Sequence, residues 1–504
     1  MNLMMLLEMA ATGFGDRTAI GSRDGSGITY QELFDRSGVA AASFESAGVA
    51  NVALVDISSP ALPIALFGSA WAGKPFVPLN YRLTPDELVA LSSEVSPSVT
   101  ICNEDTTNAL GDVNGVRKVL RSVFLETTTT GPPSDPAWSM NPDEIAILLY
   151  TSGTTGAPKA AVLRHKHLVS YILGSVEFMG ASEDEATLVS VPPYHVAGMA
   201  AVCSSVYAGR RVVQLPNFDA GVWIDTARRE HITHAMVVPT MLARIVEELD
   251  RRGDGGIATL RVLSYGGAKM ARPVIERALQ LLPDTNFVNA YGLTETSSTI
   301  AVLGPEDHRQ AVTSNDPSVT RRLGSVGQPL PSLEVSIRDD EGAEAPAGSS
   351  GEIWVRGEQV SGEYLGRNSR LTADGWFPTN DGGSLDDAGY LYVEGRIDDI
   401  IIRGGENISP GEIEDVLLTH SAIQDAAAIG IPDAQWGESI AVAVVVGSNS
   451  MVDVDEIRGF VKERLRSSRT PDLVMIVDEL PYNETGKLLR RVLRSDIAHL
   501  GSEA

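Results

Sequence analysis

A loop rich in glycine and hydroxyl side chains follows an apolar run and could bind phosphate. The run 145–150 is typical of a buried strand in a parallel sheet, the loop reads TSGTTGAPK from Thr151 to Lys159, and a helical pattern resumes near Arg164. In this position backbone NH groups, hydroxyl groups and one ammonium group converge on a small volume, which favours an anion. A surface connection has the same composition, so the loop alone leaves both interpretations open.

This loop differs from the common nucleotide-binding motif G-x-x-x-x-G-K-[ST]. That motif needs lysine directly after glycine, whereas Ala157 and Pro158 separate Gly156 from Lys159. A mononucleotide kinase or GTPase is therefore disfavoured. The candidate phosphate-binding residues are Thr151, Ser152, Gly153, Thr154, Thr155, Gly156 and Lys159.

Charged side chains further along could complete a phosphate site. Glu295 closes the run YGLTE after a predicted strand and could hold Mg²⁺, with Thr151 as a second ligand, because Mg²⁺ prefers oxygen ligands. Thr294 and Glu295 would also serve as an ordinary helix N-cap pair. Asp381 could accept hydrogen bonds from ribose hydroxyl groups, and Arg396 could reach the ribose or a phosphate. Isolated Asp and Arg residues near turns are usually solvated, which is the alternative for this pair.

A nucleotide base needs a flat and open surface, and two segments offer one. Tyr291 has small neighbours, while Gly266, Gly267 and Ala268 carry no side chain that would block a base from the other side. Both segments follow predicted strands, where open α/β sheets bind ligands. An ordinary core position is the alternative for Tyr291. The candidate residues around the base are Gly266, Gly267, Ala268, Asn289, Ala290, Tyr291, Gly292 and Thr294.

The elements that would position these residues change in type along the chain. Between about residues 29 and 300, helical patterns alternate with short apolar runs, which predicts an α/β fold with doubly wound parallel sheets. Between 330 and 395 the helical patterns give way to β runs separated by Gly, Asp and Pro turns, which predicts a small antiparallel or β-barrel-like unit. The short apolar runs between residues 29 and 300 include VALVDI at 52–57, FVPL at 76–79, LVSV at 188–191, RVVQL at 211–215 and AMVV at 235–238.

A mixed α+β pattern follows Arg396, so we predict a large N-terminal lobe, 1–397, and a small C-terminal lobe, 398–504. Its predicted strands lie near 423–431 and 439–447, and its helices near 410–419, 454–466 and 486–497. The opening MNLMMLLEMA predicts an amphipathic helix, because it lacks a positive stretch and soon meets Glu8. TTTTGPP at 127–133 is typical of a surface loop.

Composition narrows the class of protein. A chain of 504 residues, 43% of them hydrophobic, has enough apolar surface for two or more domains. A formal charge of −26 disfavours nucleic acid and anionic membranes as partners, and no apolar run reaches the roughly 18 residues of a membrane span. Cys102 and Cys203 are too few for a disulfide framework and fit core positions. We therefore expect a cytoplasmic protein, and a homodimer is one oligomeric state that the sequence allows.

Seven blocks, in the same order along the chain, resemble those of the adenylate-forming superfamily, which includes acyl-CoA synthetases, luciferases and peptide-synthetase adenylation domains. The blocks are YTSGTTGAPK at 150–159, PPYHVAG at 192–198, SYGGAK at 264–269, NAYGLTE at 289–295, TND at 379–381, GRIDDIIIRGGENISPGEIE at 395–414 and ETGK at 484–487. The resemblance implies that a carboxylic acid reacts with ATP, aided by Mg²⁺, to give acyl-AMP and pyrophosphate. The acyl group would then pass to CoA.

The resemblance also implies roles for single residues. The loop 151–159 would bind the departing phosphates, Glu295 the Mg²⁺ ion, Asp381 the ribose, and Tyr291 with its neighbours the base. Lys487 would stabilise charge in the adenylation step, although alone it would be read as a surface lysine. Two positions depart from the family pattern, since most relatives have Gly at the positions of Asn380 and Ala160. Because Asn380 directly precedes Asp381, the family pattern does not predict the backbone geometry of Asp381.

Further implied roles concern a mobile C-terminal lobe that turns between the two half-reactions. Asp398 occupies the hinge position of the family. After rotation Arg403, Gly404 and Gly405 would face the large lobe and line the tunnel for the pantetheine arm of CoA, although the two glycines could also form a simple hairpin turn. His195, in PPYHVAG, would lie at the mouth of the acyl pocket, with a positional role.

The acid is less defined than the reaction. Peptide-synthetase domains carry an Asp near the position of His195 to bind an amino group, and PPYHVAGMAAV contains none, so a free amino acid is disfavoured. Small residues in this segment indicate room for a hydrophobic body, and fatty, aryl and steroid-derived acids are all open. The rivals are a fatty acyl-AMP ligase that supplies a carrier protein, a luciferase-like oxygenase, and a non-catalytic nucleotide-binding protein. The last would be expected to have lost Lys487, Glu295 or the phosphate loop, and all three are present.

Overall fold

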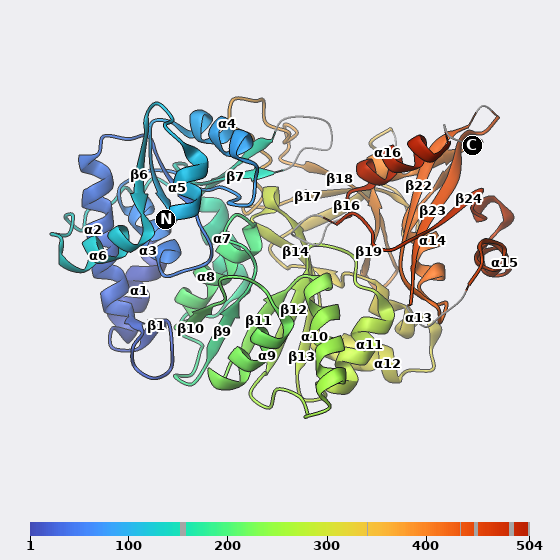
Figure 1. Cartoon of the computed structure of the whole chain (residues 1–504), viewed down its shortest axis with the longest axis horizontal. Helices are drawn as coiled ribbons and strands as arrows, with labels where there is room; N and C mark the ends of the chain where they lie inside the picture. The colour runs from blue at the N-terminus through green and yellow to red at the C-terminus, as the bar shows by residue number, and fades with distance from the viewer. Residues whose placement is uncertain (152–157, 340, 434, 448–451, 483–487, 502–504) are drawn as a thin grey trace.

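Two large, mostly parallel sheets with helices on their faces form most of the molecule, and two smaller sheets follow along the chain (Figure 1). The computed structural model describes residues 1–151, 158–339, 341–433, 435–447, 452–482 and 488–501. The alternation of helices and strands in the first part and the mixed α+β pattern in the last confirm the predicted α/β fold class.

The first parallel sheet has six strands in the order β6-β5-β3-β4-β7-β8. Only β8 runs antiparallel to its neighbour, as the second arm of a hairpin that encloses the glycine and hydroxyl loop. The strands are Asn51–Val55 (β3), Phe76–Pro78 (β4), Ser98–Cys102 (β5), Val116–Leu120 (β6), Ile145–Thr151 (β7) and Lys159–Arg164 (β8). The helices near them are Ala61–Trp71 (α3), Pro85–Val95 (α4), Glu104–Leu110 (α5), Arg121–Thr130 (α6) and His165–Ser175 (α7).

The second large sheet has nine strands in the order β15-β14-β13-β12-β11-β9-β10-β1-β2, of which β1 and β9 to β13 pair in parallel with one another. Its strands are Thr18–Ile20 (β1), Ile28–Thr29 (β2), Ala186–Val189 (β9), Arg211–Gln214 (β10), His234–Val237 (β11), Val262–Gly266 (β12), Asn286–Leu293 (β13), Ser298–Leu303 (β14) and Gln328–Pro329 (β15). The accompanying helices are Met4–Phe14 (α1), Tyr30–Ser46 (α2), Val196–Ala208 (α8), Ala220–Arg229 (α9), Pro239–Arg252 (α10), Arg272–Leu281 (α11), Pro305–Thr313 (α12), Pro317–Thr320 (α13), and the 3₁₀ turns Thr294–Thr296 (η1) and Arg321–Gly324 (η2).

Helices fill the space between the two large sheets and form one continuous core with them. Side chains of α1, α2, α3 and α8, such as Leu7, Phe44 and Phe67, pack in the same cluster as Ile147 of β7 and Val212 of β10. Separate clusters place α4 and α5 on the other face of the six-stranded sheet, and α9, α10 and α11 on the other face of the nine-stranded sheet. Both sheets are therefore covered on two faces, as the doubly wound prediction requires.

A four-stranded antiparallel sheet follows, with its strands in sequence order, so of the two predicted forms the open sheet is observed. The strands are Glu334–Arg338 (β16), Gly351–Arg356 (β17), Phe377–Leu385 (β18) and Leu391–Arg396 (β19). Its apolar face packs on Ile300 and Ala301 of β14, together with Tyr291 and Leu293 of β13. This contact brings the middle of β18 and the end of β19 close to the end of β13.

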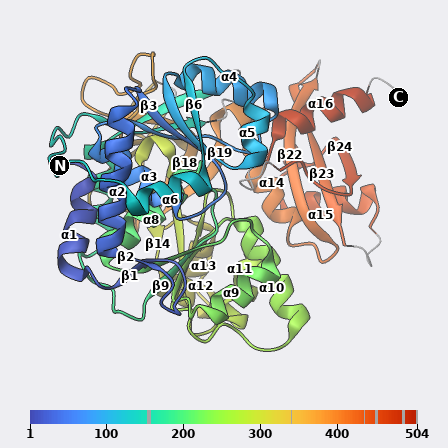
Figure 2. The same cartoon turned by 60° about the vertical axis from the view of Figure 1, so that its left-hand side comes forward.

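The C-terminal unit has a core of its own and lies to one side of the rest (Figure 2). It contains the 3₁₀ turn Ile397–Asp399 (η3), Ile401–Arg403 (β20), Glu406–Ile408 (β21), Pro410–Leu417 (α14), Ile423–Asp433 (β22), Gly437–Val446 (β23), Val454–Arg464 (α15), Ser467–Arg469 (η4), Leu473–Val477 (β24) and Arg490–Gly501 (α16). The predicted boundary at 396–399 falls on η3. That the two lobes move as separate bodies stays a prediction.

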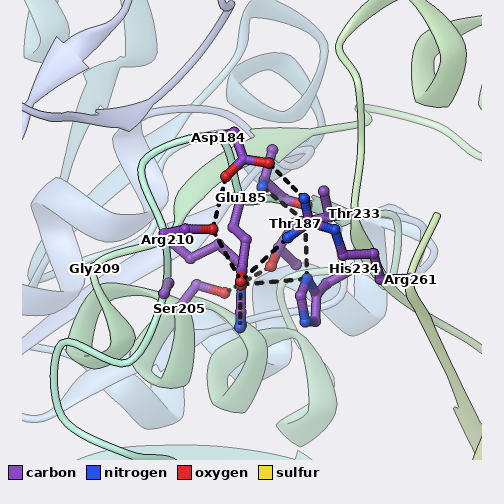
Figure 3. A network of polar contacts seen from close by, with 12 residues as sticks. Asp184, Glu185, Thr187, Ser205, Gly209, Arg210, Thr233, His234 and Arg261 are labelled. Atoms are coloured by element: carbon purple, nitrogen blue, oxygen red, sulfur yellow. Dashed lines mark hydrogen bonds and ion pairs between the residues drawn. The ribbon is translucent and has the colours of Figure 1, made fainter. Parts of the chain in front are cut away.

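Charged side chains, some partly buried and some exposed, form a network at the starts of the strands in the nine-stranded sheet (Figure 3). Glu185, just before β9, forms an ion pair with Arg210 at 2.9 Å and lies 3.7 Å from Nδ1 of His234, the first residue of β11. Asp184 pairs with Arg261 just before β12. Burial, followed by the nearby Arg210 charge, lowers the pKa of His234 to about 4. This network lies at the amino-terminal ends of these strands.

Acid is expected to destabilise the fold through buried neutral histidines such as His165. Its side chain is 1% exposed, its Nδ1 accepts a hydrogen bond from Leu3 N at 3.1 Å, and burial lowers its pKa to about 4. Between pH 6.5 and 4 the unfolded chain binds a proton that the folded chain does not, so stability falls as pH falls. From pH 7 to 5 this histidine alone should remove about 2 kcal/mol. Urea unfolding at both pH values should show a smaller decrease for His165→Asn than for wild type, and equal decreases would contradict the assignment.

The structure resolves three sequence expectations about smaller features. Thr127 to Thr130 are not a loop but the last turn of α6, because the hydroxyls of Thr127, Thr128 and Thr129 bond back to carbonyls of the preceding turn and Thr128 is buried. Cys102 and Cys203 are buried free thiols, as predicted. The predicted opening helix is α1. In the described part of the chain, no helix is both long and apolar enough to cross a membrane.

Candidate active site

Four parallel strands end at one edge of the nine-stranded sheet and direct their following segments to the same place. These strands are β9, β11, β12 and β13, whose registers align Val189 with Met236, Val237 with Tyr265, and Gly266 with Ala290. The segments that follow hold His195, Gly267 and Glu295. Such an edge is where open α/β sheets bind ligands. The sequence-predicted residues of three separate blocks therefore lie along one edge of this sheet.

The predicted phosphate-binding loop, 151–159, joins β7 to β8, and its two end residues pair as part of a β-hairpin. Thr151 and Lys159 face each other as the last pair of that hairpin, and the Thr151 hydroxyl donates a hydrogen bond to the Lys159 carbonyl at 3.4 Å. The central residues Ser152, Gly153, Thr154, Thr155 and Gly156 lie outside the described residues. Their predicted contact with phosphate therefore stays a prediction.

Glu295 is held by a tyrosine that sequence reasoning missed. Tyr364 donates a hydrogen bond from its hydroxyl to Glu295 Oε1, and the ring of Tyr364 lies 5.9 Å from Lys159 Nζ. The neighbours of Tyr364 pair with β8, so its loop lies along the hairpin. Burial and the Glu295 charge raise the pKa of Tyr364, which stays a donor at neutral pH. Glu295, Tyr364 and Lys159 thus form one cluster beside the phosphate loop.

A second carboxylate, Asp381 on β18, connects β13 with β19. The Tyr291 hydroxyl donates to Asp381 Oδ2 at 2.6 Å, and Arg396 Nη1 donates to Asp381 Oδ1 at 2.8 Å. Asp381 is 5% exposed, which makes this one of the few buried carboxylates of the chain. Each oxygen keeps one further acceptor direction, because a carboxylate oxygen has two lone pairs. A diol could therefore still bind here.

Arg396 is charged but incompletely satisfied. Burial opposes its charge, but the Asp381 carboxylate, with Glu295 and Tyr291 nearby, outweighs burial and raises the pKa of Arg396. Its Nε is buried and has no hydrogen-bond partner in the described part of the chain. A buried donor of this kind usually has a partner, so a ligand acceptor would fit next to it. Both the ribose and the α-phosphate of a nucleotide offer such acceptors.

Breaking the Asp381–Arg396 pair is expected to destabilise the protein strongly. Asp381→Ala would leave a partly buried guanidinium without its carboxylate, which costs about 3 kcal/mol of unfolding free energy. Tyr291→Phe removes a single neutral donor and should cost about 1 kcal/mol. The matched control is Glu334→Ala, which breaks an exposed pair with Arg356 in the same sheet and should cost less than about 1 kcal/mol. Equal losses for Asp381→Ala and Glu334→Ala in urea unfolding would contradict this view of the pair.

The glycines of the predicted base-binding segments have different structural roles. A Cβ on Gly266 would lie 2.1 Å from Ala290 O, and a Cβ on Gly292 would lie 1.6 Å from Ser298 O, so both are needed for the close approach of neighbouring strands. Gly267 is exposed and has a φ of +89°, which glycine adopts readily. Asn289 is tied to Ser325 O through its side chain at 3.2 Å. The surface that a base could contact is therefore offered by Gly267 and Ala268, whereas Gly266 is packed against the neighbouring strand.

His195 caps a helix beside this edge. It precedes α8, and its Nδ1 accepts a hydrogen bond from Ala197 N at 3.2 Å. Burial lowers the pKa of His195 to about 4, so the ring is neutral at physiological pH. The next helix turn is tightly packed, since a Cβ on Gly198 would lie 2.8 Å from Pro192 O. The observed N-cap contact fits a positional role and gives the ring no proton to donate from Nδ1.

The predicted hinge and CoA residues lie at the start of the C-terminal lobe. Asp398 is in η3 and is exposed. Arg403 pairs with Asp472 at 2.8 Å, and Gly404 N donates to Trp436 O at 2.7 Å, so in this structure their partners belong to the C-terminal lobe itself. Gly404 and Gly405 both have positive φ values and form the turn between β20 and β21. Lys487 lies outside the described residues.

Comparisons with known proteins show which family the chain belongs to. The AMP-binding enzyme family model matches residues 7–365, and the model of its C-terminal domain matches residues 412–487. The chain is 32% identical to a feruloyl-CoA synthase from Amycolatopsis sp. over 93% of this chain and 94% of that one. It is also 32% identical to a fatty acid–[acyl-carrier-protein] ligase from Streptomyces coeruleorubidus, over 94% and 92%.

Among solved structures, the o-succinylbenzoate coenzyme A synthetase of Bacillus subtilis, in complex with ATP and magnesium ion, superposes with a TM-score of 0.83 and 29% identity. The match covers 97% of this chain and 99% of that one. The chain belongs to the AMP-binding enzyme family, and it contains both the main domain and the C-terminal domain that the two family models describe. Within that family it is an AMP-forming acid–thiol ligase, as the resemblance predicted.

Proposed function

We propose that the protein joins a hydrophobic carboxylic acid to CoA in two steps that use ATP and Mg²⁺, and that the favoured acids are aryl acids. The carrying observation is the pair of tyrosine-bound carboxylates, Glu295 and Asp381. Asp381 forms an ion pair with Arg396, and the ring of the tyrosine that binds Glu295 lies 5.9 Å from Lys159 Nζ. This arrangement would provide separate positions for a metal-bound polyphosphate and for a nucleoside. A simple binding surface would not need both.

Glu295, with the Thr151 hydroxyl as a second ligand, would hold Mg²⁺. One oxygen of Glu295 is engaged by Tyr364, which leaves the other to bind the metal. Mg²⁺ is commonly held by one or two carboxylates plus substrate phosphates, so this donor set fits an ion that arrives with ATP. When bound, the ion neutralises negative charge on the phosphates. Lys159 and the NH and OH groups of 151–156 would bind the departing pyrophosphate.

The nucleoside would occupy the second position. Asp381 would accept hydrogen bonds from the ribose hydroxyls, and the unpartnered Arg396 Nε would donate to the ribose or the α-phosphate. The base would lie between Tyr291 and the segment 266–268, with Asn289, Ala290, Gly292 and Thr294 shaping this side. Because the Tyr291 hydroxyl bonds to Asp381, its ring is held in one orientation, which favours stacking on a flat base.

The proposed reaction has two steps. In the first step a carboxylate oxygen of the acid attacks the α-phosphorus, the bond to the β-phosphate oxygen breaks, and pyrophosphate leaves with the electron pair. Lys487 would stabilise the charge that develops on the transferring group. In the second step the CoA sulfur attacks the acyl carbon, and AMP leaves. The C-terminal lobe, 398–504, would turn about Asp398 between the steps, so that Arg403, Gly404 and Gly405 line the path of CoA.

Two observations support aryl acids as the favoured class. The similar feruloyl-CoA and o-succinylbenzoate enzymes are named for acids that carry an aromatic ring. In this chain the segment before α8 is aromatic, because Tyr194 packs edge to face on Tyr81 at 5.8 Å next to His195. Aromatic rings favour such edge and face contacts. Neutral His195 would then offer a flat wall at the pocket mouth.

A competition experiment tests the acid class. Purified protein would receive ATP, Mg²⁺, CoA and an equimolar mixture of cinnamic-type, indole-type, medium-chain and long-chain fatty, and polycyclic acids, and the acyl-CoA products would be resolved by mass. We expect aryl-CoA products to dominate. Dominance of a fatty or polycyclic product would contradict the aryl assignment while leaving the ligase reaction intact.

A carrier-protein ligase is the second candidate function. It is favoured by the similarity to a ligase named for transfer of a fatty acid to an acyl carrier protein. Replacing CoA with a phosphopantetheinylated carrier protein in the same assay distinguishes the two acceptors, because only the true acceptor should discharge acyl-AMP rapidly. A reducing compartment such as the cytoplasm is also part of the proposal, since both cysteines are free thiols.

A further inference from the structure

Asn380 adopts an unusual backbone conformation next to the buried carboxylate Asp381. Its φ is +62°, in the left-handed region that favours glycine and that asparagine also tolerates. The residue lies in β18 near the point where the register of β18 shifts against β17. Its backbone N donates to Glu352 Oε1 at 2.9 Å, which fixes this conformation on the neighbouring strand. An asparagine here therefore keeps the turn of a glycine and adds a side chain.

That side chain reaches the predicted hinge. Asn380 Nδ2 donates a hydrogen bond to Asp398 Oδ2 at 2.8 Å. The acceptor is a carboxylate, which makes the bond stronger than one between neutral groups. Asp398 is exposed, so water competes for it and the bond contributes only modestly. A bond of this strength can hold one arrangement and still be released.

The same strand segment also contacts the proposed nucleoside position. Asp381, the next residue, binds Arg396, which precedes Asp398 by two positions. Further contacts across the lobes lie nearby: Lys269 Nζ pairs with Asp415 Oδ2 of α14 at 2.6 Å, and Ser409 Oγ donates to Glu394 O at 2.7 Å. Lys269 directly follows the proposed base segment 266–268. The nucleoside position and the lobe contacts are therefore connected through a few residues.

We propose that Asn380 is a positioning residue that holds Asp398 and so favours the lobe orientation seen in this structure over the alternative one. The proposal rests on the proposed function, because it takes Asp398 as the hinge between two half-reactions. Loss of the bond would shift molecules from the observed orientation to the other. One half-reaction should then slow while the other becomes faster, whereas general damage to the fold would slow both.

Asn380→Gly is the direct test, because glycine adopts the same φ without strain and the substitution removes only the side chain that reaches Asp398. Asn380→Asp is the stronger test, because it keeps the shape and places a carboxylate against Asp398. We expect the ratio of acyl-AMP formation to thioester formation from supplied acyl-AMP to change about threefold to tenfold in Asn380→Gly, with the two rates moving in opposite directions. The change should have the same direction and be larger in Asn380→Asp. The matched control, Asn315→Gly in an exposed loop, should leave the ratio unchanged.

Lobe orientation can be measured without catalysis. Both native cysteines are buried, so a donor and an acceptor dye can be placed on Asp112→Cys in the large lobe and on Asp455→Cys in α15, both highly exposed positions. The distance distribution between the dyes should shift toward a second population in Asn380→Gly. An unchanged distribution, or half-reaction rates that fall together, would overturn the proposal. Absence of both half-reactions in wild type would instead count against the proposed function, and the dye distances would still test the hinge contact.

Discussion

Lys487→Ala is expected to reduce acyl-AMP formation by about 1000-fold while leaving thioester formation from supplied acyl-AMP within about threefold of wild type. The reason is that the ammonium group would act only on the charge that develops as pyrophosphate leaves. The second half-reaction has no such charge at that position. Stopped assays that measure pyrophosphate release in one experiment, and acyl-CoA from synthetic acyl-AMP in another, separate the two effects.

Two further variants make the Lys487 result specific. Lys487→Arg keeps the charge but changes its shape, so it should recover only part of the adenylation rate. Lys462→Ala removes a lysine from the last turn of α15 in the same lobe and should leave both half-reactions unchanged. Equal losses in both half-reactions for Lys487→Ala would show that the lysine supports the fold or binding in general, and would contradict its assigned step.

Glu295→Gln is expected to slow acyl-AMP formation by about 100-fold or more and to raise the Mg²⁺ concentration needed for half-maximal rate. The amide keeps the size of the side chain but removes the negative charge that would hold the ion. Tyr364→Phe keeps the carboxylate and removes only its hydrogen bond, so a decrease of about tenfold is expected. Pyrophosphate release measured across a Mg²⁺ titration gives both the rate and the metal dependence.

Glu363→Gln is the matched control for Glu295. Glu363 is the neighbour of Tyr364, but its carboxylate pairs with Arg164 at 2.8 Å and is partly exposed. Its substitution should change adenylation by less than about threefold. If Glu295→Gln lowered the rate with an unchanged Mg²⁺ dependence, the carboxylate would be acting on something other than the metal, and the proposed site would be wrong in this respect.

Local sequence patterns predicted the architecture well because apolar periodicity and turn residues act over short distances. The run 145–150, the alternating segments up to residue 300 and the strands near 423–431 and 439–447 all appear in the structure. The same reasoning did not assign Lys159–Arg164, a short strand directly between the loop and α7. It also assigned Thr127–Thr130 to a loop, where the burial of Thr128 and back-bonding hydroxyls retain the helix.

The contacts within the candidate site, by contrast, could not be predicted from local sequence patterns. Asp381 and Arg396 pair across the register of β18 and β19, which their separate prediction did not include, and the contact of Asp381 with Tyr291 depends on the packing of two different sheets. Tyr364 had no local signal at all, because it meets Glu295 from 69 residues away through a loop that lies along β8. Asn380 was recognised as a departure from the family pattern, yet its contact with Asp398 required the positive φ that only the structure gives.

The most direct test of the account is a two-stage single-turnover experiment with the purified protein in excess over an accepted acid. The first stage contains ATP and Mg²⁺ without CoA, and the second adds CoA, with acyl-AMP and acyl-CoA followed separately by mass. The account predicts that acyl-AMP and pyrophosphate form in equal amounts in the first stage and that acyl-AMP converts to acyl-CoA in the second. Formation of ADP and phosphate, or acyl-CoA without a preceding acyl-AMP, would contradict it.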